Sequence, residues 1–126
     1  MPFLLPNWPT VSVVIPHYND VAALGRCVAR LHAQTWPATK MEIIVADNNS
    51  SCGLDAVRAA AAGCSVVLAT EQGAGPARNV GIGVSTGDII ALIDSDCIPE
   101  PGWIEEGVKA LRGFDFVGGE VVTTAE

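Results

Sequence analysis

Positive charge and long apolar runs are both scarce in this sequence. Seven Lys and Arg residues stand against fourteen Asp and Glu residues, which gives a formal net charge of −7. A nucleic-acid surface needs basic side chains that neutralise phosphates, so we expect no nucleic-acid partner. No apolar run approaches the ~18 residues that a membrane-spanning helix requires, and we therefore expect no transmembrane segment.

Signals for export and for cross-linking are also missing. The opening MPFLLPNWPT lacks a basic region and is interrupted by prolines, so residues 1–10 are predicted to be an N-terminal tail and not a signal peptide. The four cysteines form no C-x-x-C pair, which favours reduced thiols in a cytoplasmic protein over a Cys52–Cys64 bridge. A peripheral contact with the inner membrane face through the apolar tail is the less favoured alternative.

Two kinds of segment alternate along the rest of the chain. Short β-branched, apolar stretches are separated by stretches whose apolar residues recur at helical spacing. This alternation is typical of an α/β fold with a mostly parallel sheet and helices on both faces. The length of 126 residues suits one domain, expected over residues 11–126. The predicted strands are 11–16, 41–47, 65–70, 88–94 and one within 114–122, and the predicted helices are 21–34, 54–62, 75–85 and 101–112.

The segment IIALIDSDCIPEPGW, residues 89–103, places two acids after an apolar run. Asp94 and Asp96 would point to the same side if the strand continued. Two such carboxylates offer hard oxygen ligands to Mg²⁺ or Mn²⁺, and a diphosphate would complete the coordination. The alternative is that one acid caps the next helix and the other is a solvated turn residue.

Other polar residues also follow predicted strands, at the carboxyl ends where parallel sheets bind ligands. Asp47 could accept an N–H from a base or bind ribose hydroxyls, although an acid before a helix is commonly a cap. Tyr18 could stack on a base or pack at its loop. Arg78 begins a glycine-broken helix, and its guanidinium could meet a phosphate or Asp94, or remain a surface side chain.

Several stretches together resemble family 2 glycosyltransferases of the GT-A fold: VSVVIPHYND, MEIIVADNNSS, GPARNVGIGVSTGDIIALIDSDCIPEPGW and GGEV. The resemblance covers about residues 11–122 in the right order and spacing. It implies a Rossmann-like GT-A fold and an inverting transfer of a sugar from a nucleotide-diphosphate donor. It also implies a Mg²⁺ or Mn²⁺ cofactor and an acceptor that is a saccharide or a lipid-linked glycan.

The resemblance assigns roles to single positions. It implies that Asp47 binds the base, commonly uracil, which favours a UDP-sugar. This sequence has Asn48 where the family often has a second acid, which leaves the preferred nucleotide open. Arg78 would lie near the diphosphate or the base, Asp94 near the ribose, and Asp96 at the metal and the diphosphate. The implied nucleotide-binding residues are Pro16, His17, Tyr18, Asn19, Asp47, Asn48, Arg78, Asp94 and Ser95, and the implied metal ligands are Asp96 and Asp94.

The general base of the family is a carboxylate in the second half of the domain, and we expect it beyond residue 126. The chain is therefore expected to be the donor-binding half of a truncated fold, which binds nucleotide and metal but has little or no transfer activity alone. Exposed apolar edges would favour self-association.

Two other functions compete with this interpretation. One is a non-catalytic nucleotide-binding or interaction module with the same fold. The other is a sugar-phosphate nucleotidyltransferase, which is disfavoured because such enzymes have a loop rich in glycine and arginine after the first strand, where this chain has PHYND.

Overall fold

The computed structural model describes residues 8–111 and 122–123. The strand expected within 114–122 lies outside the described residues except for Val122, which begins a short strand. In chain order the elements are β1 (Val11–His17), α1 (Val21–His32), the 3₁₀-helix η1 (Ala38–Lys40), β2 (Met41–Asp47), α2 (Leu54–Ala60), β3 (Ser65–Leu68), α3 (Ala74–Val84), β4 (Ile89–Leu92), β5 (Cys97–Ile98), α4 (Trp103–Ala110) and β6 (Val122–Thr123).

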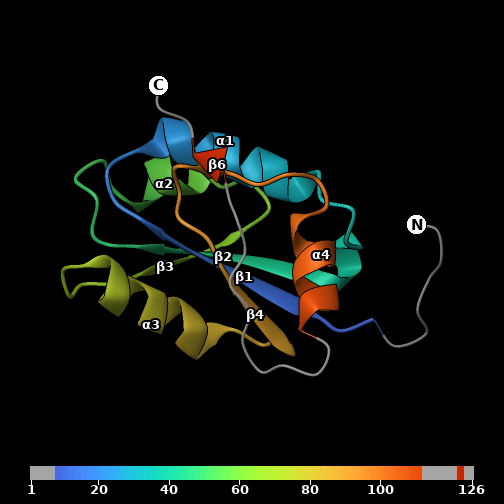
Figure 1. Ribbon diagram of the computed structural model, residues 1–126. Coiled ribbons are helices and arrows are strands. Elements are labelled where there is room, and N and C mark those ends of the chain that lie inside the picture. The colour runs from blue at the N-terminus through green and yellow to red at the C-terminus, as the bar shows by residue number, and fades with distance from the viewer. Residues whose placement is uncertain (1–7, 112–121, 124–126) are drawn as a thin grey trace.

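Four strands form one sheet in the order β3-β2-β1-β4, and β5 pairs separately with β6. All pairings in the larger sheet are parallel, and Val11 of β1 is in register with both Met41 of β2 and Ile89 of β4. Figure 1 shows α3 on one face of this sheet and α1 and α2 on the other. The predicted α/β class, with a parallel sheet between helices, is confirmed.

The main core lies on the face covered by α1, α2 and α4. Successive strand residues point to opposite faces, so Val11, Val13 and Ile15 of β1 all reach this core. The apolar stripe predicted for α1 is buried here, and the helix begins where the side chain of Asp20 accepts the N–H of Ala23 at 3.2 Å. None of the described helices is long and apolar enough to cross a membrane.

The core on the opposite face, between the sheet and α3, is formed by small residues. Ala46, Ala69 and Ala77 form the buried cluster between α3 and the sheet. Gly81 lies directly on β1, since a Cβ atom built on it would stand 2.5 Å from Cγ1 of Val14. The glycine that lowers the helix propensity of this segment therefore permits close packing of α3 on β1.

Two expectations about the fourth strand are wrong. The strand ends at Leu92, so Asp94 and Asp96 lie in a turn and not on a continuing strand. It is also not buried on both faces, because Ile90 and Leu92 are 40% and 46% exposed. The reason is its position, since β4 lies at the edge of the four-stranded sheet. An apolar run alone does not distinguish a central strand from an edge strand.

Candidate functional site

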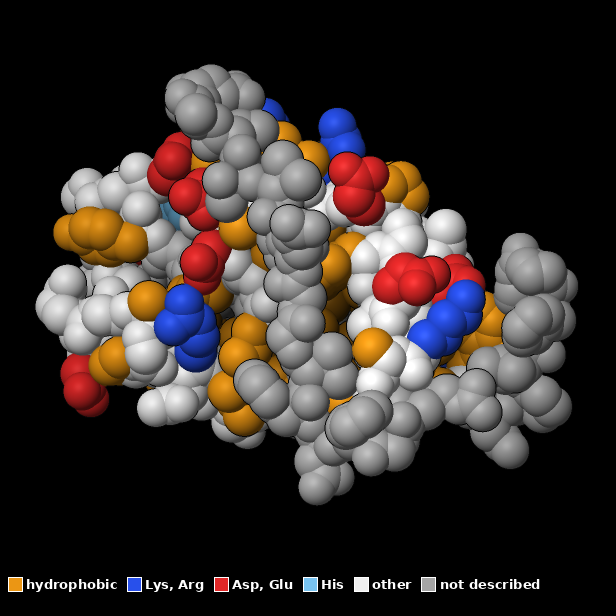
Figure 2. All heavy atoms as spheres, in the orientation of Figure 1, with side chains coloured by type: hydrophobic (Ala, Val, Ile, Leu, Met, Phe, Trp, Pro, Cys, Tyr) orange, Lys and Arg blue, Asp and Glu red, His pale blue; other side chains and the backbone are white. Residues whose placement is uncertain are grey.

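The carboxyl ends of β1, β2 and β4 meet at one edge of the sheet, together with the start of α3. His17 ends β1 and is in register with Asp47, which ends β2. Figure 2 shows basic side-chain atoms over α3 with acidic atoms directly beside them. We call this edge the carboxyl rim and define it as residues 16–20, 47–51, 69–78 and 93–96. It contains every residue that the sequence analysis proposed for nucleotide or metal binding.

A buried hydrogen-bond cluster joins β1 to β2 within the carboxyl rim. His17 and Asp47 are 2% and 1% exposed, and Nδ1 of His17 lies 2.8 Å from Oδ1 of Asp47. Ser50 donates its hydroxyl to the same oxygen at 2.7 Å and its backbone N–H to Oδ2 at 3.0 Å. Both oxygens of Asp47 are therefore engaged inside the protein, and Ser50 is a member of the cluster that the sequence did not indicate.

The bonds of this cluster also fix its protonation. Nε2 of His17 lies 3.0 Å from the backbone N–H of Asp20 and accepts it, so the ring proton is on Nδ1 and is donated to Asp47. Burial is the largest influence on Asp47 and raises its pKa. The hydrogen bonds from Ser50 and His17 together outweigh burial and hold the pKa of Asp47 below its ordinary value. The pair is a neutral imidazole beside a carboxylate.

The loop after β1 is tied to the loop after β2 through Asn19. Its backbone has a positive φ of 52°, a conformation that asparagine tolerates better than most residues. Its N–H donates to Oγ of Ser50 at 2.8 Å, and its Oδ1 accepts the N–H of Ser51 at 2.8 Å. Tyr18, by contrast, is 54% exposed, so its ring is available to a ligand. A shallow depression of about 260 Å³ is lined by Asn19, Val21, Ser51 and Cys52.

Asn48 is buried and connects β2 to the loop before α3. Its Nδ2 donates to the carbonyl oxygens of Ala69 at 2.9 Å and Glu71 at 2.7 Å. Its Oδ1 accepts the N–H of Gly73 at 2.9 Å. The side chain that the resemblance implied for nucleotide contact is therefore bonded on both its nitrogen and its oxygen to the backbone of this chain.

The two acids after β4 lie in a turn that is closed by the N–H of Cys97, which donates to the carbonyl oxygen of Asp94 at 3.1 Å. Both carboxylates are exposed, and Ser95 between them is partly buried. Nη2 of Arg78 lies 2.9 Å from Oδ1 of Asp94. The sequence predicted a phosphate or Asp94 as the partner of Arg78, and the structure shows the pair with Asp94.

The carboxylates at this turn can supply only part of the coordination sphere of a metal ion. Within residues 8–111 and 122–123 there is no cluster of three or more His, Cys, Asp and Glu side chains that could hold a metal ion. Asp94 and Asp96 contribute two carboxylates, which are hard oxygen ligands of the kind that Mg²⁺ and Mn²⁺ prefer. The chemistry of these residues fits such an ion, provided that a bound ligand or water completes the sphere.

A second network, which the sequence did not indicate, fixes the segment that follows the two acids. Gln34 is 9% exposed and lies just after α1. Its Nε2 donates to the carbonyl oxygen of Glu100 at 2.6 Å, and its Oε1 accepts the N–H of Ile104 at 3.0 Å. That N–H is one of the unpaired donors at the start of α4, which has no side-chain cap of its own. Gln34 therefore holds the start of α4 against the end of α1.

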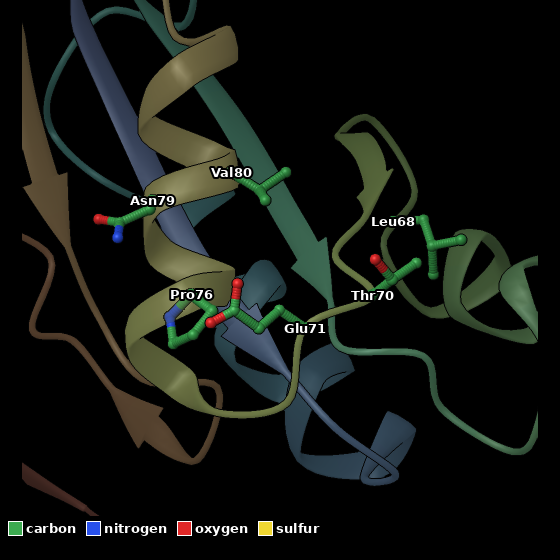
Figure 3. A pocket seen from close by; sticks show the side chains of 6 residues that line it. All are labelled: Leu68, Thr70, Glu71, Pro76, Asn79 and Val80. Carbon is green, nitrogen blue, oxygen red and sulfur yellow. The ribbon is translucent and has the colours of Figure 1, made fainter.

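A wider depression of about 400 Å³ lies between the end of β3 and α3, as Figure 3 shows. Its lining residues are Leu68, Thr70, Glu71, Pro76, Asn79 and Val80. Arg78, Asp94 and Asp96 do not line it. This depression is therefore separate from the paired charges of the carboxyl rim.

All four cysteines are free thiols, so the Cys52–Cys64 bridge is not formed. Burial raises the pKa of Cys27 to about 12 and that of Cys64 to about 11. Such thiols are poor nucleophiles near neutral pH, because the thiolate is the reactive form.

Comparison with known proteins identifies the family. A model described as glycosyl transferase family 2 matches residues 12–125. The chain belongs to glycosyl transferase family 2. Glycosyltransferase AglE of Haloferax volcanii is 38% identical over 123 residues, which cover 92% of this chain and 40% of AglE. Pre-mycofactocin glycosyltransferase of Mycobacterium tuberculosis is 35% identical over 103 residues, which cover 79% of this chain and 20% of that protein.

Solved structures of glycosyltransferases share the fold of this chain. Mannosyltransferase PcManGT from Pyrobaculum calidifontis, in complex with GDP-Man and Mn²⁺, has a TM-score of 0.76 with 29% identity, and the match covers 84% of this chain and 33% of that chain. TarS 1-349 of S. aureus has a TM-score of 0.70 with 23% identity over 82% of this chain and 32% of that one. The chain therefore spans less than half the length of the relatives that it matches.

Proposed function

We propose that this chain is the donor-binding half of a glycosyltransferase that moves a sugar from a nucleotide diphosphate to an acceptor with inversion. The observation that carries the proposal is the arrangement of charges at the carboxyl rim, where Arg78 meets Asp94 at 2.9 Å beside the exposed Asp96. A cation and two carboxylates in neighbouring positions suit a ligand that carries both phosphate and a divalent ion. Membership of family 2 supports the same conclusion.

The exposed side chains of the carboxyl rim are the proposed contacts with the donor. Tyr18 would stack on the base, Arg78 would meet the diphosphate, and Asp94 with Ser95 would lie at the ribose. The buried residues Pro16, His17, Asp47 and Asn48 would act by holding these side chains in place, because the polar side chains among them are bonded inside the protein. Asn19 is exposed, and it would act by tying the loop after β1 to the loop after β2 through its bonds to Ser50 and Ser51.

Asp96 and Asp94 are the residues that would hold Mg²⁺ or Mn²⁺. When bound, such an ion supplies positive charge that stabilises the diphosphate as the sugar leaves. Arg78 contributes a second positive charge from α3. Its ion pair with Asp94 keeps both side chains at the rim before a donor binds, and this exposed pair is weak enough, at about 0–1 kcal/mol, to be exchanged for phosphate contacts.

The nucleobase and the acceptor are further parts of the proposal. A UDP-sugar is favoured by the resemblance to family 2, and GDP is the alternative to test because PcManGT was solved with GDP-Man and Mn²⁺. The acceptor would be a saccharide or a lipid-linked glycan, and the general base would come from residues beyond 126. A cytoplasmic location and self-association through the exposed edge of β4 complete the proposal.

Thermal unfolding with added ligands tests the proposal. UDP or GDP with Mn²⁺, at about 100 times its dissociation constant, should stabilise the chain by about 2.7 kcal/mol, which raises the melting temperature by several degrees. Asp96→Asn should remove the part of this increase that depends on the metal. Glu106→Gln, which changes an exposed acid on α4, is the matched control and should keep it. No stabilisation by either nucleotide with either metal would overturn the proposal.

A transfer assay on the full-length protein then separates an enzyme from a binding module. Transfer from a UDP- or GDP-sugar, lost in Asp96→Asn, is the expected result. Nucleotide binding without transfer to any saccharide or lipid-linked acceptor would show a non-catalytic module instead.

A further inference from the structure

The side chain of Asn48 uses both of its polar atoms to hold the loop before α3. The amide nitrogen donates to the carbonyl oxygens of Ala69 and Glu71, and the amide oxygen accepts the N–H of Gly73 at 2.9 Å. Asn48 is 6% exposed, so water has little access to these bonds. The backbone N–H of Asn48 donates to the carbonyl oxygen of His17 at 2.8 Å, which fixes Asn48 itself to the end of β1.

This loop determines where α3 begins. Gly73 precedes the first residue of the helix with a φ of 120°, a conformation that favours glycine, and no side chain of this segment caps the helix. The bond from Gly73 to Asn48 is therefore a local restraint on the entry into α3. Arg78 lies in the second turn of that helix, from which its guanidinium reaches Asp94.

We propose that Asn48 is a positioning residue, which holds residues 69–73 so that Arg78 stands where a donor diphosphate would bind. This inference rests on the proposed function, and it deepens that function by giving Asn48 a role without contact to the nucleotide. It also gives a physical reason for an amide where the family often has an acid. A carboxylate has no N–H to donate and would repel the carbonyl oxygens of Ala69 and Glu71.

The chain offers a matched control for this substitution. Asn49 is the next residue, it is exposed, and its backbone has a positive φ of 64° that aspartate also tolerates. Asn48→Asp and Asn49→Asp each add one negative charge at almost the same place in the carboxyl rim. Any general repulsion of phosphate by the added charge therefore appears in both variants, whereas loss of the loop bonds appears only in Asn48→Asp.

Calorimetry of the full chain with Mn²⁺ and UDP or GDP is the first measurement. Asn48→Asp should weaken the binding of the nucleotide by on the order of tenfold or more relative to Asn49→Asp, because misplacing a contact group by about 1 Å has effects of this size or larger. Hydrogen exchange should show faster exchange at the amide of Gly73 in Asn48→Asp but not in Asn49→Asp. Asn48→Ala, which removes the bonds without adding a charge, should change both measurements in the same direction, and it serves if the aspartate variant does not fold.

A double-mutant cycle with Arg78→Gln distinguishes positioning from general destabilisation. If Asn48 acts through Arg78, Asn48→Ala should have little further effect on nucleotide affinity once Arg78 has been replaced. Effects that add in full, or equal affinities of Asn48→Ala and wild type, would overturn the inference while leaving the proposed function intact. A wild type that binds neither nucleotide would overturn the proposed function, and the role of Asn48 in binding with it.

Discussion

Two glycines of α3 should respond in opposite directions to the same substitution. A Cβ on Gly81 would lie 2.5 Å from Cγ1 of Val14, whereas a Cβ on Gly83 would have no neighbour within 4 Å. Val14 is completely buried in the central strand, and its β-branched side chain has few alternative rotamers. Gly81→Ala therefore requires α3 to move away from β1, while Gly83→Ala requires no movement.

The expected magnitudes follow from these contacts. Attractive carbon contacts have optimal separations of roughly 3.5–4.0 Å, so the added methyl group at position 81 would stand about 1 Å too close. Overpacking of this kind costs about 1–3 kcal/mol, and the higher helix propensity of alanine recovers up to about 1 kcal/mol. We expect Gly81→Ala to lower the free energy of unfolding by about 1–2 kcal/mol. Gly83→Ala should raise it by about 0.5–1 kcal/mol, because only the propensity term remains.

Urea unfolding of the two variants and the wild type, followed by circular dichroism, measures both changes. In thermal unfolding, the melting temperatures of the two variants should move in opposite directions by roughly 4 °C per kcal/mol. The displaced helix of Gly81→Ala should also carry Arg78 away from Asp94, so nucleotide binding should weaken as well. If Gly81→Ala is as stable as Gly83→Ala, α3 does not pack on β1 as closely as described, and the account of the glycines is wrong.

Three further predictions concern buried and surface polar groups. Asp47→Asn should be less stable than wild type by about 1–3 kcal/mol near pH 7. Because the folded-state pKa of Asp47 is lowered, the stabilisation from its carboxylate is present above the unfolded pKa of about 3.9 and is lost as pH falls through the folded value. Urea unfolding should therefore show that the difference in stability between wild type and Asp47→Asn shrinks below about pH 4. Gln34→Leu leaves the N–H of Ile104 without its partner and should lower stability by about 1–3 kcal/mol in thermal unfolding. The control Gln72→Leu, at an exposed site, should change stability by less than about 0.5 kcal/mol. Equal effects of the two variants would contradict the capping role of Gln34. Arg78→Gln should lower stability by no more than about 1 kcal/mol yet weaken nucleotide binding in calorimetry, and unchanged binding would argue against its contact with the diphosphate.

The residues of the carboxyl rim could be predicted from the sequence, but the partners of several could not. Sequence position placed Asp47 and Asn48 at the end of a strand, because an apolar run stopped just before them. It did not show that Ser50 and His17 occupy the oxygens of Asp47, or that Asn48 reaches residues 69–73. These bonds depend on which strands are neighbours, and on how closely their loops approach in space.

The pattern of apolar residues by itself determined the succession of strands and helices, the parallel sheet and the edge at which polar residues gather, since burial of a periodic apolar face is a local property of the chain. Only the tertiary structure decided that β4 is an edge strand and that Asp94 and Asp96 stand on a turn. It also decided that Gln34 caps α4 and that Gly81 is a contact point, because each of these depends on atoms brought together from distant parts of the sequence.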